Sequence, residues 1–293
     1  GGVGHTWVKR LFIDKDYQNK ERPEDYTFIK SLVYDNKFLM EVDPDYVRAL
    51  ENLPEDRRKA MLHGDWDIFE GQYFPEFDRD IHVIEPFQIP GDWRRYRAID
   101  YGLDMLACYW IAVDNHNKSY VYKELYQDNL IISDAAKEIL RMNGNDIIYS
   151  TFAPPDLWNR RQETGKSAAD LFRDNGVTLR KVSNDRVQGW YGIKEWLKPF
   201  KDEQEILTAS MVFFRNCLNI IRCLPQLQMD DKHPNDVAND PHEITHGPDA
   251  IRYYCAGRPR ANEVPKKKDP NSYDAKYQRM VDSITGGEVK INL

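Results

Sequence analysis

The chain has 293 residues, of which 41% are hydrophobic and 30% charged, and its formal net charge at pH 7 is −7. This composition is typical of a soluble globular protein and excludes a disordered chain, and no apolar run approaches the roughly 20 residues that a membrane span needs. Nucleic-acid binding by the whole surface is also excluded, because counterion release requires clustered Lys and Arg, so any contact with DNA must use a local basic patch.

The first part of the chain, residues 1–88, is predicted to combine short apolar segments with a helical stretch from Asp43 to His63 that divides at Leu53-Pro54. The opening Gly1-Gly-Val-Gly lacks a Met and runs straight into a regular pattern, which indicates part of a longer chain. The four cysteines show no CxxC spacing and are predicted to be reduced core residues, which fits a reducing cytoplasm.

An α/β pattern begins near residue 94. Strands rich in Tyr, Ile and Val are predicted at Tyr96–Gly102, Met105–Val113, Tyr120–Tyr126, 146–152 and Val177–Val182. Capping and stop signals predict helices at Asp134–Met142, from Ser167 to Asn175, and from near Pro248 onward. The order β-β-β-α-β-α-β, followed by a helix, predicts a ribonuclease-H-like α/β fold with a mixed five-stranded sheet flanked by helices.

In such a sheet the first and fourth strands are parallel neighbours about 4.8 Å apart, so acids at their carboxyl-terminal ends meet. Asp100 lies at the end of the first strand, and Asp156 follows the fourth strand beyond Pro154-Pro155. Asp249 opens the last helix, with His246 three residues earlier. An acid in a central buried strand is costly unless it is paired or metal-bound, so we expect Asp100 and Asp156 to face each other near Asp249.

Converging carboxylates suit phosphodiester hydrolysis. Two divalent cations roughly 3.5–4 Å apart can activate water and stabilise the leaving oxygen, and hard oxygen ligands hold such ions. The predicted catalytic and metal-binding set is therefore Asp100, Asp156 and Asp249. His246 is either a metal ligand or proton relay, or else a helix cap or surface histidine. His242 precedes it by four residues but lies ahead of Pro248, so no zinc site is predicted.

Basic residues gather in two places. Gly165-Lys166-Ser167 opens a helix but is no phosphate loop, because the first glycine of that motif would fall on Arg160; the segment is either a seat for a DNA phosphate or a solvated loop. Residues 180–201 carry an excess of Lys and Arg that could bind the phosphates along a DNA backbone. The aromatic residues among them, however, have the helical spacing typical of core residues. The predicted DNA-contacting residues are Arg160, Arg161, Lys166, Arg180, Lys181, Arg186, Lys194 and Lys198.

Three motifs resemble those of the carboxyl-terminal half of tailed-bacteriophage terminase large subunits: Ile99-Asp-Tyr-Gly102, Ala153-Pro-Pro-Asp-Leu-Trp-Asn-Arg-Arg161 and Pro241-His-Glu-Ile-Thr-His-Gly-Pro-Asp-Ala-Ile-Arg-Tyr-Tyr254. The segment from Gly1 to Lys9 resembles the end of the family's packaging ATPase, and Gly64-Asp-Trp66 the joint between its domains. The resemblance implies a DNA-packaging motor whose nuclease half uses two Mg²⁺ or Mn²⁺ ions to cut concatemeric double-stranded DNA. It also implies the portal protein and the terminase small subunit as partners, in the host cytoplasm and without a membrane.

The second acid departs from the family's pattern. There it often directly follows a Tyr-Ala or Phe-Ala pair, where this chain has Pro154. Either Asp156 takes this role, or Glu124 in the third strand or Asp104 contributes.

The expected organisation has three parts. Residues 1–88 would be the trailing edge of a P-loop ATPase domain plus a connector, residues 89–257 the nuclease, and residues 258–293 a basic and polar tail. ATP turnover is not expected, because no phosphate loop is present; ATP would act only through the missing ATPase part. Two alternatives are a resolvase or transposase on the same fold, and a non-catalytic module that docks DNA or the portal.

Overall fold

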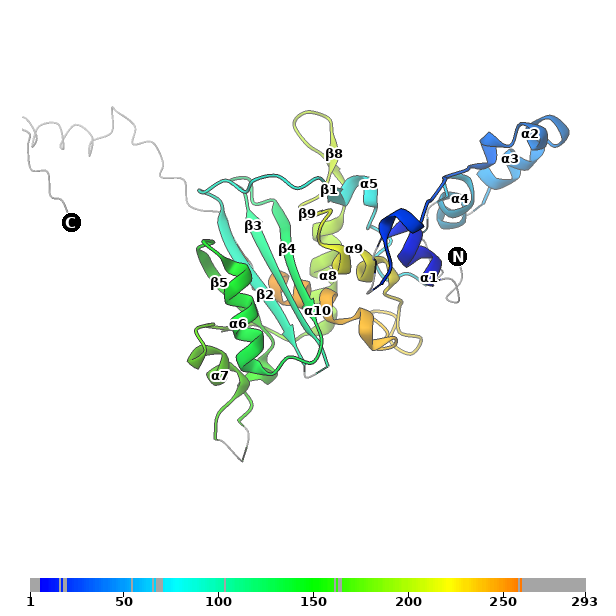
Figure 1. Cartoon of the computed structure of the whole chain (residues 1–293). Helices are drawn as coiled ribbons and strands as arrows, with labels where there is room; N and C mark the ends of the chain where they lie inside the picture. The colour runs from blue at the N-terminus through cyan, green and yellow to red at the C-terminus, as the bar shows by residue number, and fades with distance from the viewer. Residues whose placement is uncertain are drawn as a thin grey trace, which may run out of the picture. The chain divides into compact units, whose positions relative to one another are not determined.

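A mixed sheet forms the centre of the computed structural model (Figure 1), and among the described residues it has seven strands in the order β1-β9-β4-β3-β2-β5-β6. Its strands are β1 (Val83–Ile84), β2 (Arg94–Tyr101), β3 (Leu106–Val113), β4 (Ser119–Gln127), β5 (Ile148–Ala153), β6 (Arg180–Lys181) and β9 (Met211–Phe214). A separate hairpin pairs β7 (Phe200–Lys201) with β8 (Leu207–Thr208).

The structure describes residues 6–15, 17, 20–53, 55–64, 66, 71–102, 104–160, 162, 165–257 and 259. Residues 1–261 belong to one compact unit. The second unit, residues 262–293, lies outside the described residues, and so does the predicted basic tail at 258–293 except for Pro259.

The pairing of the strands confirms the ribonuclease-H-like prediction. Strands β2, β3 and β4 form an antiparallel meander, and β5 pairs in parallel with β2, with Ala98 opposite Phe152. Strand β6 follows β5 in parallel. The central order β4-β3-β2-β5-β6 therefore makes the first and fourth predicted strands parallel neighbours.

The predicted count of five strands is wrong, because β9 and β1 extend the sheet in parallel beyond β4. Strand β9 is a short run, Met211-Val-Phe-Phe214, that is buried on both faces and so lacks the alternation that marks a half-exposed strand. Strand β1 has only two residues and carries almost no pattern. The predicted fifth strand is also shorter than expected, at Arg180–Lys181.

The described helices are α1 (Thr6–Val8), α2 (Lys37–Val42), α3 (Asp45–Glu51), α4 (Glu55–Leu62), α5 (Arg79–His82), α6 (Ile132–Asn143), α7 (Ala168–Asp174), α8 (Arg186–Leu197), α9 (Leu218–Cys223) and α10 (His246–Ala256). Lys9–Ile13 forms a π-helical turn, and 3₁₀ turns lie at Pro23–Asp25, Val33–Asp35, Pro155–Trp158, Leu224–Gln226 and His242–Ile244. Within the described part of the chain, no helix is both long enough and apolar enough to cross a bilayer.

Helices cover both faces of the sheet (Figure 1). On one face the indole nitrogen of Trp110 in β3 donates to Asn143 at the end of α6. On the other face the ring of Tyr96 in β2 contacts that of Tyr254 in α10. All eight residues of β3 are consequently buried, which explains why Leu106–Val113 reads as an almost unbroken apolar run. All four cysteines are buried and free, as predicted.

The segment before the sheet has a small core of its own, formed by Val47, Leu50 and Leu62 from α3 and α4. The predicted helical stretch divides between these two helices, while Pro54 lies outside the described residues. The main core begins at Tyr73 and Phe74, which pack edge-on against Trp190 of α8. The division after residue 88 stays a prediction, and the packing around the sheet starts earlier in the chain.

Candidate metal centre

Asp100 lies near the end of β2, in the middle of the sheet. Because side chains alternate along a strand, Asp100 shares the α10 face with Tyr96 and Ala98. Only 18% of its side chain is exposed. A carboxylate in this position loses hydration, which is costly unless a partner compensates the charge.

The partner is His246, the first residue of α10, whose Nδ1 lies 2.8 Å from Oδ2 of Asp100. Its side chain is 7% exposed. The start of α10 can approach the sheet this closely because residue 247 is a glycine: a Cβ there would lie 2.7 Å from the hydroxyl oxygen of Tyr109 in β3. The structure therefore brings His246 into direct contact with Asp100.

The negative charge around this pair favours a proton or a cation. Burial raises the pKa of Asp100, the hydrogen bond from His246 partly offsets this, and the charge of Asp249 raises the pKa further. Burial alone would lower the pKa of His246, but the hydrogen bond and charge of Asp100, together with Asp104 and Asp249, raise it. A bound divalent cation would satisfy the same charges.

Asp249 lies one helical turn after His246 and is held by a buried arginine. Nε and Nη2 of Arg252 lie 2.8 and 2.6 Å from Oδ1 of Asp249, and the Arg252 side chain is only 2% exposed. The guanidinium stacks over Trp190 of α8, 5.0 Å from the ring centroid. Its aliphatic stem lies against Gly189, where a Cβ would collide with it. Arg252 thus fixes one carboxylate oxygen of Asp249.

Asp156 is an exposed residue in the 3₁₀ turn that follows β5. It lines a hollow of about 300 Å³ together with Tyr101 and Gly102, the two residues that follow Asp100. Burial raises the pKa of Tyr253; the charge of Arg252 opposes this, and the charges of Asp100, Asp249 and Asp156 add to it. The charges of all three aspartates therefore act on the Tyr253 hydroxyl. Pro154, in an extended conformation, and Pro155 connect the end of β5 to this turn.

Glu124 and Asp104, the other two candidate acids, contact different parts of the fold. Glu124 in β4 accepts hydrogen bonds from the backbone nitrogens of Asn219 (2.8 Å) and Ile220 (3.3 Å), so its carboxylate caps α9. Burial raises the pKa of Glu124 to about 7, against the opposing effect of these bonds. Asp104, in the loop after β2, lies 3.3 Å from Nε2 of His246.

Three predicted DNA-contacting residues lie on the Asp156 side of the sheet. Arg160 lines the same hollow as Asp156. Arg180 and Lys181 form β6 beside the end of β5, and both are exposed. Nζ of Lys181 lies 5.1 Å from the ring centroid of Trp158, which follows Asp156 by two residues. The structure thus brings these basic side chains near one of the candidate acids.

Two other basic residues of this set are engaged within the fold. Nε of Arg186 lies 3.1 Å from both carboxylate oxygens of Asp236. Nζ of Lys194 donates to the backbone carbonyl of Tyr73 and lies over its ring, 4.3 Å from the centroid. Trp190, between them on α8, is fully buried, as its core spacing predicted.

The remaining predicted basic residues lie elsewhere on the fold. Nζ of Lys166 lies 2.6 Å from Asp174 on α7. Lys198 is exposed at the end of α8, and Arg161 lies outside the described residues.

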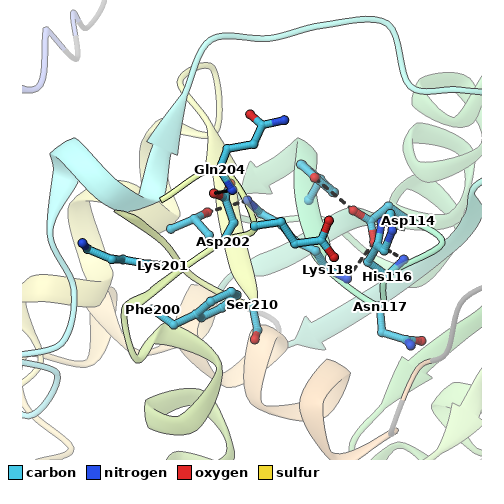
Figure 2. A pocket seen from close by; sticks show the side chains of 12 residues that line it. Asp114, His116, Asn117, Lys118, Phe200, Lys201, Asp202, Gln204 and Ser210 are labelled. Atoms are coloured by element: carbon cyan, nitrogen blue, oxygen red, sulfur yellow. Dashed lines mark hydrogen bonds between the residues drawn. The ribbon is translucent and has the colours of Figure 1, made fainter. Parts of the chain in front are cut away.

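A larger hollow, of about 490 Å³, lies at the opposite end of the sheet, between the β3–β4 turn and the β7–β8 hairpin (Figure 2). Its charged groups serve the local fold. Asp114 accepts from the backbone nitrogens of His116 and Lys118, and Nζ of Lys118 lies 2.5 Å from Oγ1 of Thr208. Asp114 follows the end of β3, whereas Asp100 pairs with Ala107 near its start. This hollow is separate from the candidate metal centre.

Two residues at the centre were not found from the sequence. His242 contacts Asp104, and the 3₁₀ turn at His242–Ile244 runs almost directly into α10, so the two histidines lie close together although both precede Pro248. The i, i+4 spacing of the two histidines was the available signal. Arg252 follows Asp249 by three residues, and that i, i+3 spacing could have predicted an ion pair.

These features define a class of fold: a mixed ribonuclease-H-like sheet with acids gathered at the carboxyl end of its central parallel pair. No protein-family model matches the sequence, and no curated protein sequence matches it. Solved structures do match. The large terminase of a thermophilic bacteriophage, in complex with ADP, is 17% identical with a TM-score of 0.51, over 85% of this chain and 58% of the terminase chain.

The P22 large terminase nuclease domain also matches, with 15% identity and a TM-score of 0.51 over 65% of this chain and 94% of the P22 domain. The nuclease domain of the bacteriophage SPP1 large terminase, solved with bound Mn, is 18% identical over 61% of this chain and 95% of that domain, with a lower TM-score of 0.42. The chain spans 58% of the length of the thermophilic phage's terminase in the ADP complex, and 45% in another structure of the same terminase. The predicted resemblance to phage large terminases is confirmed at the level of the fold.

Proposed function

We propose that this chain carries the metal-dependent DNA endonuclease of a phage large terminase, which cuts concatemeric viral DNA during packaging by a two-metal-ion mechanism. The observation that supports this most is the contact of 2.8 Å between His246 and Asp100 at the end of β2, with Asp249 one turn along α10. The fold likeness to the P22 large terminase nuclease domain supports the same class of activity.

The donor set suits a hard divalent cation, since carboxylate oxygens are the ligands that Mg²⁺ and Mn²⁺ prefer. Asp100, Asp156 and Asp249 would hold two such ions, with Asp100 shared between them. The ions would supply an activated water and neutralise charge on the leaving oxygen. Arg252 orients Asp249 through Oδ1 and leaves the other oxygen for a cation. His246 orients Asp100 and can hold a proton beside it.

Double-stranded DNA is the proposed substrate. Arg160, Arg180 and Lys181 are positioned to hold its phosphates without reading sequence, because they are exposed near Asp156. In the full motor we expect the portal protein and the terminase small subunit as partners, in the host cytoplasm. ATP would act through an ATPase part, of which residues 1–88 are the proposed trailing edge. Residues 89–257 are the proposed nuclease.

The direct test is nicking of supercoiled plasmid by the 293-residue chain in Mn²⁺ or Mg²⁺, compared with EDTA. We expect wild-type activity only with metal, and loss of at least about 100-fold in Asp100→Asn and in Asp249→Asn. Asp128→Asn, which changes an exposed aspartate just after β4, is the matched control and should keep full activity.

The outcome also separates the two alternatives. Absence of nicking in every metal would favour a non-catalytic docking module. A strong preference for branched over linear duplex would favour a resolvase.

A further inference from the structure

A second cluster of ligating groups lies beside the carboxylates of the candidate metal centre. Asp104, His242 and His246 each offer one ligand atom, and these atoms all lie within 4.8 Å of one another. Nε2 of His242 is 3.2 Å from Oδ2 of Asp104, and Nε2 of His246 is 3.3 Å from the same oxygen.

The local fold brings the three groups together. The 3₁₀ turn at His242–Ile244 and the start of α10 place the two imidazoles edge to face, with ring centroids 4.5 Å apart and an angle of 64° between the ring planes. The loop after β2 supplies Asp104 from the other side. The side chains of His242 and Asp104 are 65% and 57% exposed, whereas that of His246 is 7% exposed. The cluster is therefore open to ions from solvent and is anchored on a buried imidazole.

Two of the three separations between the ligand atoms match those around a tetrahedral ion, and the third is no more than 4.8 Å. Ligands about 2.1 Å from a Zn²⁺ ion are roughly 3.4 Å apart along each edge of the tetrahedron. The two measured edges, 3.2 and 3.3 Å, are close to this value. Three protein ligands would leave a fourth position for water.

The orientation of His246 supports the same assignment. When Nδ1 donates its proton to Asp100, the neutral ring presents the lone pair of Nε2 to Asp104. Two lone pairs facing each other at 3.3 Å need a cation or a proton between them. A histidine that donates to a carboxylate through its other nitrogen is the usual arrangement of a transition-metal ligand, in which the carboxylate fixes the tautomer.

We propose that Asp104, His242 and His246 form a metal site for a borderline divalent cation of the Zn²⁺ or Co²⁺ class, with Asp100 as the carboxylate that orients His246. The site differs from the carboxylate set of Asp100, Asp156 and Asp249 in its ligands, because imidazole nitrogens select Zn²⁺ or Co²⁺ over Mg²⁺. Its existence does not depend on nuclease activity. A cation bound at this site would fix the His246 ring in position, and would thereby also restrain Asp100, which contacts that ring.

The test is a titration of the 293-residue chain with Zn²⁺ by calorimetry and with Co²⁺ by visible absorption. Excess Mg²⁺ is present throughout to occupy the carboxylate set of Asp100, Asp156 and Asp249. Binding of Zn²⁺ or Co²⁺ then reports on the histidine-containing site alone. We expect one tight Zn²⁺ site and the intense absorption of tetrahedral Co²⁺. His242→Ala should weaken Zn²⁺ binding by more than about 100-fold, because loss of a ligand exceeds the roughly 10–100-fold effect of an outer partner.

Two further variants keep the result interpretable. Asp104→Asn, in an exposed loop, should also lose tetrahedral Co²⁺ absorption. A far-ultraviolet circular dichroism spectrum equal to that of the wild type will show that each variant is folded. His233→Ala removes an exposed histidine that lies 3.3 Å from Asp230 and belongs to no group of three ligands among the described residues, so this variant should bind Zn²⁺ as the wild type does. Equal Zn²⁺ affinity in the wild type and His242→Ala would overturn the proposal, and so would octahedral Co²⁺ in the wild type. Both outcomes are independent of DNA cleavage.

Discussion

Arg252→Met should destabilise the protein through Asp249. Arg252 is 2% exposed and its partner carboxylate 13%, so the substitution leaves a nearly buried charge without its counterion. Breaking a buried ion pair by removing one partner typically costs about 3–5 kcal/mol. We expect a loss near the lower end, about 3 kcal/mol, because Asp249 keeps some contact with water. Methionine preserves most of the packing against Trp190 and Gly189.

The assay is urea unfolding in EDTA, followed by tryptophan fluorescence, with a double-mutant cycle that includes Asp249→Asn. Once Asp249 is neutral, Arg252→Met should cost much less, since no charge is left unpaired. Arg173→Met is the matched control: Arg173 pairs with Asp170 at the same i, i+3 spacing on the surface of α7, and we expect no measurable loss. A loss below about 1 kcal/mol in Arg252→Met, or an equal loss in the Asp249→Asn background, would refute the assigned coupling.

The further predictions concern the acids and the basic edge. Asp100→Asn should melt at the same or a higher temperature than wild type in EDTA, because it relieves repulsion, and should lose Mn²⁺-dependent stabilisation; equal Mn²⁺ shifts in both proteins would contradict the site. In plasmid nicking, Asp156→Ala should lose at least about 100-fold and Glu124→Ala much less, and the reverse order would place Glu124 in the catalytic set. Because the folded pKa of Glu124 is raised from 4.5 to about 7, its contribution to stability is present below pH 4.5 and lost as pH rises through 7; urea unfolding of Glu124→Gln should lack that fall. Neutralising Arg180 and Lys181 together should reduce the slope of log K against log salt for DNA binding by up to about 2, and an unchanged slope would place the DNA elsewhere.

The central sheet could be predicted because its strands carry strong local signals. Leu106–Val113 is apolar throughout. Asp100 stands out because it is an acid in a largely buried strand, where side chains point alternately to the two faces of the sheet. The added strands could not be predicted in the same way. Val83–Ile84 and Met211–Phe214 are too short for a period, and their pairing is decided by long-range packing against β4.

Members of the candidate site could be proposed from the sequence where a residue type is enough to indicate the chemistry, but not where contacts between distant segments bring the residues together. His246 was a candidate from its spacing to Asp249. The cluster with Asp104 depends on a loop conformation and on a continuous turn before α10. The role of Arg252 depends on Gly189 in another helix, which leaves room for its stem.

The basic residues illustrate the same limit. Arg180 and Lys194 both contribute to the local excess of positive charge in the sequence. In the fold Arg180 is exposed at the sheet edge, whereas Lys194 binds the carbonyl of Tyr73. A count of Lys and Arg cannot distinguish a surface charge from one that the fold uses.

The measurement that tests the central proposal most directly is a crystal of the 293-residue chain soaked in Mn²⁺, with the ions located by anomalous scattering. We expect Mn²⁺ bound by Asp100 and Asp249, with Asp156 completing the second ion, and loss of both peaks in Asp100→Asn. Mn²⁺ that binds without Asp100, or that gathers only at Asp104 and His242, would contradict the two-metal carboxylate site.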